Sequence, residues 1–338
     1  MTLIGGNINS NATIYSATEE NNNKSSCTTY SVAKAKKNDK EMTGVYDITF
    51  TTPFTSCPII LSKQNNNNWS DFSSRNCNAK NNTLLVAVNT DKCRIKTGDS
   101  KNNTENKNFS FIALSPETTQ LPSNVVVGHV TAKGERYAGT NFACKKISTG
   151  YYIIALTSIC STEYPVVVAQ PLIADSANTC LNATIVAIDK EWIEIKIGND
   201  DGDAMDAEFV FVAYDPSISP TGENTGVETY SGTVNASGDA HSGSGFQVTH
   251  TSTNDGHFTI NFDNATLEDK AIIFACENYF NWTDFDATEG KTTSNVDPLY
   301  RRVSITQTYQ QQMDIKTGDE SGKGIDRNFC FWCVNLAA

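Results

Sequence analysis

Two copies of one tryptophan-centred pentapeptide supply the residues of this sequence that are best suited to bind a carbohydrate. The copies read NWSDF at positions 68–72 and NWTDF at positions 281–285. A sugar ring presents a C–H face that packs on an aromatic ring, while neighbouring carboxylates and amides hydrogen-bond to its hydroxyl groups. Six residues are therefore the candidates for ligand binding: Asn68, Trp69, Asp71, Asn281, Trp282 and Asp284.

A structural interpretation of the same pentapeptides stays open. A tryptophan in a polar loop also packs well against its own protein, because its large ring can anchor the loop to the core. Phe72 and Phe285 would then join that anchor. A contact between the tryptophan and another protein is the third interpretation.

The sequence contains few residues that could perform catalysis. It has no His-Glu-x-x-His motif, no Gly-x-Ser-x-Gly elbow and no phosphate-binding loop. An enzyme needs a nucleophile, a base or a metal in convergent geometry. We interpret the histidines as solvated or strand-surface side chains, and we predict a non-enzymatic protein without catalytic residues. These histidines are His129, His241, His250 and His257.

Two clusters resemble metal sites, and neither predicts one. Carboxylates at Asp200, Asp201, Asp203 and Asp206 could bind calcium, but they lack the spacing of an EF-hand. A solvated acidic turn is the favoured interpretation, calcium is the alternative, and no other cofactor is predicted. The pair Cys330 and Cys333 lies in a predicted strand, where residues three apart face opposite sides.

The ten cysteines do not occupy matching positions along the chain. A disulfide framework would recur with a repeated domain, whereas free cysteines are among the residues most often buried. Buried free thiols are therefore favoured over disulfides.

An internal repeat must position the candidate residues. IKTGD at 95–99, IKIGN at 195–199 and IKTGD at 315–319 are each followed by a Phe-x-Phe pair, eleven residues after the glycine. The two phenylalanines of a pair share one face of a strand, because side chains alternate. We expect the glycine of each motif to occupy a turn that needs positive φ.

Two further segments recur in the same order. GVYDITF, GYYIIAL and GHFTINF begin at Gly44, Gly150 and Gly256, and their large apolar residues alternate as in a half-buried strand. The runs PIIL, PVVV and AIIF follow, which favours strands buried on both faces or lying at an inter-domain contact. The second copy lacks the tryptophan pentapeptide that follows this run in the first and third copies.

The strand pattern predicts an all-β protein. No segment shows sustained helical periodicity, and Pro- and Gly-containing stretches separate the copies. We predict three tandem antiparallel β-sandwich domains of about 100 residues. Their boundaries are 1–116, 122–216 and 227–338, called here the first, second and third repeats.

The charge and hydropathy exclude some partners. A formal net charge of −12 makes nucleic acid and anionic membranes poor partners. No segment reaches the roughly 20 apolar residues of a membrane-spanning helix, so we predict no membrane insertion. The N-terminal stretch also lacks the basic start and apolar run of a classical signal peptide.

Nearly the whole chain resembles two known kinds of small β domain, three times over. The first repeat has ITF, TPF and PIIL, then VAV, then FSFIAL. This order is similar to that of H-type (snail agglutinin-like) lectins and of domains at the tips of phage tail fibres. Segments 198–214 and 245–262 look most like the fibre-tip domains. The resemblance implies six-stranded antiparallel sandwiches that assemble around a threefold axis.

This resemblance and the tryptophans together predict a lectin-like adhesin. Its partners would be glycans or a cell-surface receptor, bound through several loops at once. We expect it at an extracellular or virion surface, with cytoplasmic residence left open, and self-associated as a trimer or folded as a pseudo-trimer within one chain. The alternative function is a structural component of a virion, a tail fibre or an extracellular fibre.

Overall fold

The computed structural model has an all-β fold, which confirms the predicted class. It describes residues 3–14, 29–66, 82–98, 103–117, 124–157, 164–173, 181–199, 203–217, 227–250, 256–263, 271–279, 302–308, 312–318 and 324–336. These residues form strands β1 to β23, and none of them belongs to a helix that could span a membrane.

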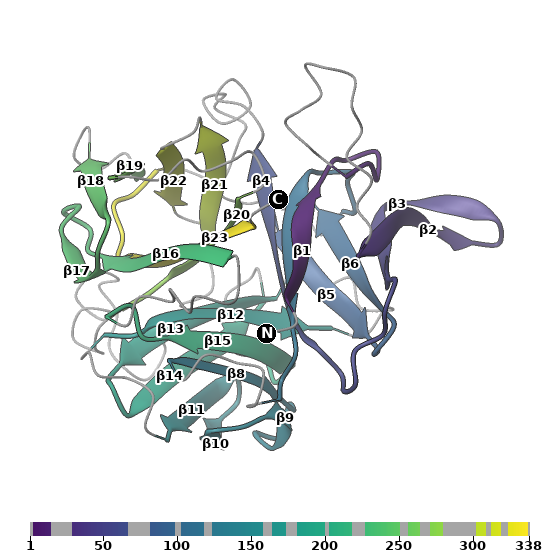
Figure 1. Ribbon diagram of the computed structural model, residues 1–338. Helices are drawn as coiled ribbons and strands as arrows, with labels where there is room; N and C mark the ends of the chain where they lie inside the picture. Colours follow the sequence, from purple (N-terminus) through teal and green to yellow (C-terminus); the bar gives the residue numbers. More distant parts are fainter. Residues whose placement is uncertain are drawn as a thin grey trace.

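The strands follow one another at similar spacing in the three repeats (Figure 1). The first repeat contains β1 (Leu3–Ile8), β2 (Tyr30–Lys37), β3 (Lys40–Phe50), β4 (Ile59–Asn66), β5 (Asn82–Val88), β6 (Lys92–Gly98) and β7 (Phe109–Leu114). The second contains β8 (Val125–Val130), β9 (Arg136–Gly139), β10 (Phe142–Ser148), β11 (Tyr151–Leu156), β12 (Val166–Leu172), β13 (Asn182–Ile188), β14 (Trp192–Gly198) and β15 (Glu208–Tyr214). The third contains β16 (Val227–Val234), β17 (Ala240–Gly243), β18 (Phe246–His250), β19 (His257–Phe262), β20 (Ile272–Glu277), β21 (Arg302–Thr308), β22 (Gln312–Gly318) and β23 (Phe329–Leu336).

Two sets of antiparallel pairings recur in each repeat. The strands that begin within the apolar runs PIIL, PVVV and AIIF are β4, β12 and β20, called here the apolar-run strands. In one set, each apolar-run strand pairs with the Phe-x-Phe strand of its repeat, which in turn pairs with the first strand, in the orders β4-β7-β1, β12-β15-β8 and β20-β23-β16. The other set has the orders β2-β3-β6-β5, β10-β11-β14-β13 and β18-β19-β22-β21. The alternating segments and the Ile-Lys-x-Gly segments are therefore neighbours in the second set, as in the pairing of Tyr46 with Ile95.

Short parallel contacts connect the repeats to one another. Leu172 of β12 pairs with Leu85 of β5, and Ile305 of β21 pairs with Asn65 of β4. A bridge between Ile185 and Asn278 joins the second repeat to the third. Each repeat thus contacts both others, and the three contacts close a cycle around a common centre (Figure 1).

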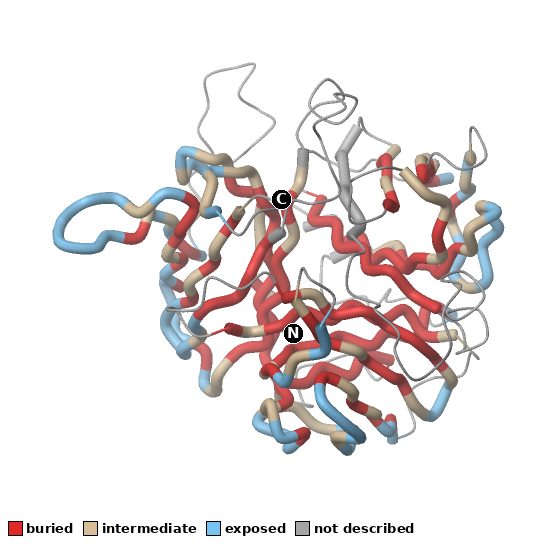
Figure 2. The backbone as a smooth tube through the Cα atoms, turned by 180° about the vertical axis from the view of Figure 1, so that it is seen from behind, coloured by how far each residue is buried: buried red, intermediate tan, exposed pale blue. Residues whose placement is uncertain are grey.

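The apolar runs are buried on both faces, as the sequence predicts. In β20, Ile273 and Ala275 belong to the core of the third repeat, whereas Ile272 and Phe274 belong to a larger core that contains residues of all three repeats. Buried positions accordingly run through the centre of the molecule, while the tip of the β2–β3 hairpin projects with exposed residues (Figure 2). This shared core is the main apolar contact between the repeats.

The cysteines on β23 face opposite sides of their strand, which confirms the alternation predicted for them. Cys330 lies in the core shared by the repeats, and Cys333 lies in the core of the third repeat. Among the described residues no disulfide is formed by the cysteines, which are Cys57, Cys93, Cys144, Cys276, Cys330 and Cys333.

The prediction for the motif glycines was wrong. Gly98, Gly198 and Gly318 do not have positive φ; that conformation occurs instead in the hairpin glycines, as at Gly150 with φ of 65°. A Cβ on Gly98 would lie 2.6 Å from the carbonyl oxygen of Asn103. Close backbone approach, rather than a left-handed turn, therefore explains the glycine at this position.

Candidate functional site at the junctions between the repeats

The six candidate ligand-binding residues, Asn68, Trp69, Asp71, Asn281, Trp282 and Asp284, lie outside the described residues. The strands before them are described. The first pentapeptide follows β4, whose residue Asn65 pairs with Ile305 of the third repeat. The second follows β20, after which Asn278 bridges to Ile185 of the second repeat. Both pentapeptides thus follow strand ends at matching junctions between repeats.

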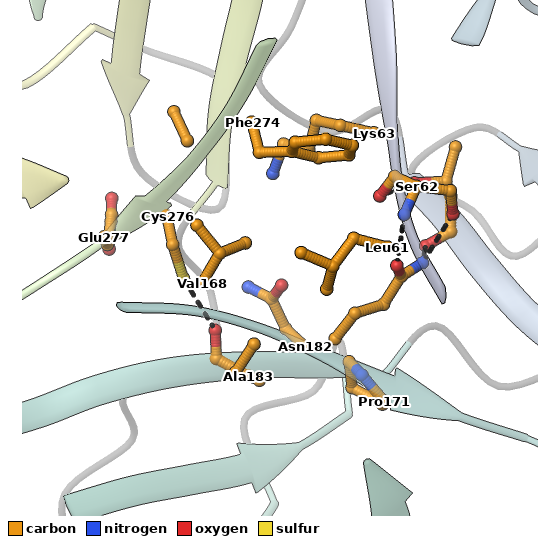
Figure 3. A pocket seen from close by; sticks show the side chains of 14 residues that line it. Leu61, Ser62, Lys63, Val168, Pro171, Asn182, Ala183, Phe274, Cys276 and Glu277 are labelled. Atoms are coloured by element: carbon orange, nitrogen blue, oxygen red, sulfur yellow. Dashed lines mark hydrogen bonds between the residues drawn. The ribbon is translucent and has the colours of Figure 1, made fainter. Parts of the chain in front are cut away.

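The three apolar-run strands meet at a small central cavity (Figure 3). Leu61, Val168 and Phe274, one from each repeat, line it at matching positions. The cavity has a volume of about 30 Å³. That space suits ordered water and is far smaller than a pocket for a small-molecule ligand.

One side-chain position next to this cavity cross-links neighbouring repeats. Gln170 of β12 accepts a hydrogen bond from the backbone N–H of Ser62 at 2.6 Å, and it donates to the Ser62 hydroxyl at 2.7 Å and to the Thr83 carbonyl at 3.2 Å. The matching residue of the third repeat, Cys276, points its thiol at the carbonyl of Ala183 in the second repeat, at 3.6 Å. Both contacts tie one repeat to the next.

A buried ion pair also lies at this junction. The guanidinium of Arg327 is 3.8 Å from the carboxylate of Glu277, and both side chains are almost fully buried. Arg327 also donates to the hydroxyl of Tyr279 at 3.4 Å. Glu277 lines the cavity together with Lys63, so the ion pair places charge beside a centre lined by both polar and apolar side chains.

The thiols of Cys276 and Cys330, beside the central cavity, have low reactivity. Burial raises the pKa of Cys276 and of Cys330 above the ordinary value of a thiol. Cys330 donates to the carbonyl of Val167 at 2.7 Å, which is another contact between the third and second repeats. The thiolate is the nucleophilic form of cysteine, so both side chains are poor nucleophiles at neutral pH.

Two of the histidines, His129 and His250, are less exposed than the sequence suggests. His129 is only 5% exposed and contacts Glu208, with 3.2 Å between Nε2 and Oε2. His250 lies 3.0 Å from Asp326, whose carboxylate also accepts a hydrogen bond from the backbone N–H of Gly256. A solvated or strand-surface side chain was therefore the wrong interpretation for His129, which is buried on β8. His250 takes part in a contact that supports its hairpin.

In the acidic turn of the second repeat, the carboxylates of Asp203 and Asp206 contact other groups of the protein. Asp206 accepts a hydrogen bond from the backbone N–H of Gly150 at 2.9 Å and forms an ion pair with Lys146. Asp203 contacts the Asn199 amide. Asp200 and Asp201 lie outside the described residues, and the part of the chain that the structure describes contains no group of three potential metal ligands.

A cluster that the sequence does not reveal surrounds Tyr137. Its ring centroid lies 4.7 Å from that of His129, and its residue exposure of 63% is the highest among the large hydrophobic side chains described. His129 and Glu208 are 79 positions apart in the sequence. A comparison of the three repeats position by position would have been the only signal for this cluster.

Comparison with known proteins identifies no relative: no family model, no curated protein and no solved structure matches this chain. The resemblance to snail agglutinin-like lectins and fibre-tip domains therefore stays a prediction.

Proposed function

We propose that this chain is a non-enzymatic, carbohydrate- or receptor-binding adhesin, built from three antiparallel β-sandwich modules closed into a ring. The observation that carries the proposal is the cycle of matching parallel contacts at Leu172–Leu85, Ile305–Asn65 and Asn278–Ile185. Such a ring holds equivalent segments of the three modules at equivalent places.

The two tryptophan pentapeptides suit this arrangement. Each begins a few residues after a junction strand, β4 or β20. Binding residues are often found on segments that connect the elements of a rigid scaffold. The packed core shared by the repeats provides that scaffold.

Multivalency would provide the affinity. Two binding segments held on one rigid body engage a multivalent surface such as a glycan layer, because the second contact forms at high effective concentration. The overall affinity then exceeds that of either segment alone. A weak site in each of two modules is enough for adhesion to a densely glycosylated surface.

A glycan array tests this function directly. The wild-type protein should bind a defined group of glycans, and Trp69→Ala or Trp282→Ala should weaken binding to an immobilised glycan by at least about tenfold. Trp192→Ala, which removes a half-buried tryptophan on β14, is the matched control. Thermal unfolding should show that the first two variants keep their melting temperatures.

Two outcomes contradict the proposal. If Trp69→Ala and Trp282→Ala both unfold the protein, these tryptophans belong to the core and the binding site is lost as a hypothesis. If the wild type binds no glycan and light scattering shows large assemblies, the structural alternative, a virion or fibre component, replaces the adhesin.

A further inference from the structure

The second repeat departs from the other two at the residue before its Phe-x-Phe pair. In the first and third repeats this residue is an asparagine that supports a turn. Asn108 accepts a hydrogen bond from the backbone N–H of Ser10 at 2.8 Å, and Asn328 accepts one from Ala236 at 2.8 Å. The second repeat has Glu208 at this position, so a charged carboxylate replaces a neutral amide.

Glu208 contacts a histidine that is also specific to the second repeat. His129 pairs with Val210 in the sheet, and the matching residues of the other repeats are Asn7 and Thr233. The histidine is buried, whereas the Glu208 side chain is 45% exposed. The carboxylate therefore remains accessible while the imidazole holds one of its oxygens at 3.2 Å.

Tyr137 completes this set from β9, a short strand that pairs with β8. Its ring lies against the His129 ring, at an interplanar angle of 55°. His129 thus contacts both an exposed aromatic ring and a partly exposed carboxylate. An aromatic ring and a carboxylate that both contact one histidine supply the two groups needed to recognise a sugar ring, because one binds C–H groups and the other accepts hydrogen bonds from hydroxyls.

The Glu208 end of the cluster lies next to the end of β12, the strand that matches β4 and β20. Glu208 pairs with Leu172, the last residue of β12. Leu172 forms the parallel contact with Leu85, and the next residue, Ile173, donates its N–H to the Leu85 carbonyl at 2.9 Å. β12 matches β4 and β20, which precede the tryptophan pentapeptides, and the second repeat lacks that pentapeptide.

We propose that Tyr137 and Glu208 form a third carbohydrate-contact site, which takes a pyranose ring of the bound glycan. The sugar packs its C–H face on Tyr137 and donates a hydroxyl hydrogen bond to the Glu208 carboxylate. This inference rests on the proposed function and extends it, since it gives the second repeat a binding role without a tryptophan. All three repeats then contribute to multivalent binding.

The test uses the full chain and the immobilised glycan that the array identifies. The background is the double variant Trp69→Ala/Trp282→Ala, so that residual binding reports the second repeat alone. Tyr137→Ala and Glu208→Asn should each weaken that residual binding by at least about tenfold. Glu208→Asn copies the residue of the other repeats, and it should keep the wild-type melting temperature.

Ile147→Ala is the matched control, because Ile147 is an exposed apolar residue on β10 outside the cluster. It should leave binding unchanged in both backgrounds. If the double variant binds no glycan, the same substitutions in the wild-type protein decide the question, and a loss of affinity there still supports the site.

The outcomes separate this inference from the proposed function. If Tyr137→Ala and Glu208→Asn bind like their parents while the tryptophan variants bind weakly, the third site is wrong and the adhesin proposal stands. If the wild-type protein binds no glycan, the third site is wrong, and light scattering then decides whether the structural alternative replaces the adhesin.

Discussion

The side-chain amide of Gln170 contacts Ser62 at both its oxygen and its nitrogen. The oxygen accepts from the Ser62 backbone N–H at 2.6 Å, and the nitrogen donates to the Ser62 hydroxyl at 2.7 Å. The two residues belong to different repeats and both are buried. One side chain of β12 therefore satisfies a backbone group of β4 that lies outside the short pairing of β4 with β21.

We predict that Gln170→Leu lowers the free energy of unfolding by about 1–3 kcal/mol, because it leaves the buried Ser62 N–H unsatisfied. Urea denaturation measures this change. Gln247→Ala removes an exposed glutamine that contacts Asp263, and it should change stability by less than about 0.5 kcal/mol. Equal stability of the Gln170 variant and the wild type would show that the cross-link between repeats is unimportant.

We predict that Phe274→Ala costs about 3–5 kcal/mol, because Phe274 is 1% exposed and its removal enlarges the central cavity. Phe274→Leu should cost less, since it leaves a smaller hole. Thermal unfolding followed by circular dichroism gives both values. A loss below about 1 kcal/mol for the alanine variant would mean that the repeats hold together without this shared core.

The central thiols should resist labelling in the native protein. Burial raises the pKa of Cys330, and the nearby Cys276 adds to this shift. At pH 8 we expect a thiol reagent to modify Cys57, which is only half-buried, before Cys276 or Cys330. Peptide mass spectrometry with and without urea identifies the labelled sites. Native labelling of Cys330 as fast as that of Cys57 would contradict its burial between the repeats.

The stability of the second repeat should fall in mild acid because of His129. Burial lowers the pKa of His129 more than the hydrogen bond and the charge of Glu208 raise it. Below the ordinary histidine pKa of about 6.5, the unfolded chain therefore binds more protons than the folded chain. The contribution of His129 is fully present above that pH, and it is lost as the pH falls through the lowered pKa.

His129→Asn, which copies Asn7 of the first repeat, tests this pH dependence. Urea midpoints of the wild type should decrease between pH 7.5 and pH 5, and the variant should lose part of that decrease. His241→Asn is the control, because His241 lies on the short strand β17 and is exposed. Parallel pH profiles for wild type and His129→Asn would contradict the prediction.

Local patterns in the sequence predict most of the strands. Alternation places Tyr46 and Ile48 in the core, and the run Ile59–Leu61 is buried on both faces. Side-chain alternation is a property of any strand, so these predictions need no knowledge of the partner strand. The glycine at position 98 was misassigned because a close backbone approach and a positive φ select the same residue.

The contacts between repeats depend on the tertiary structure alone. No pattern near Leu85 or Leu172 indicates that these two strands run side by side, because a short parallel contact uses backbone groups that every residue carries. The same holds for the Tyr137–His129–Glu208 cluster, whose members come from three strands. The sequence by itself determined the repeat, the strands and the faces that the strands bury. Only the packing of strands that are far apart in the sequence decided where the repeats meet and which side chains lie together there.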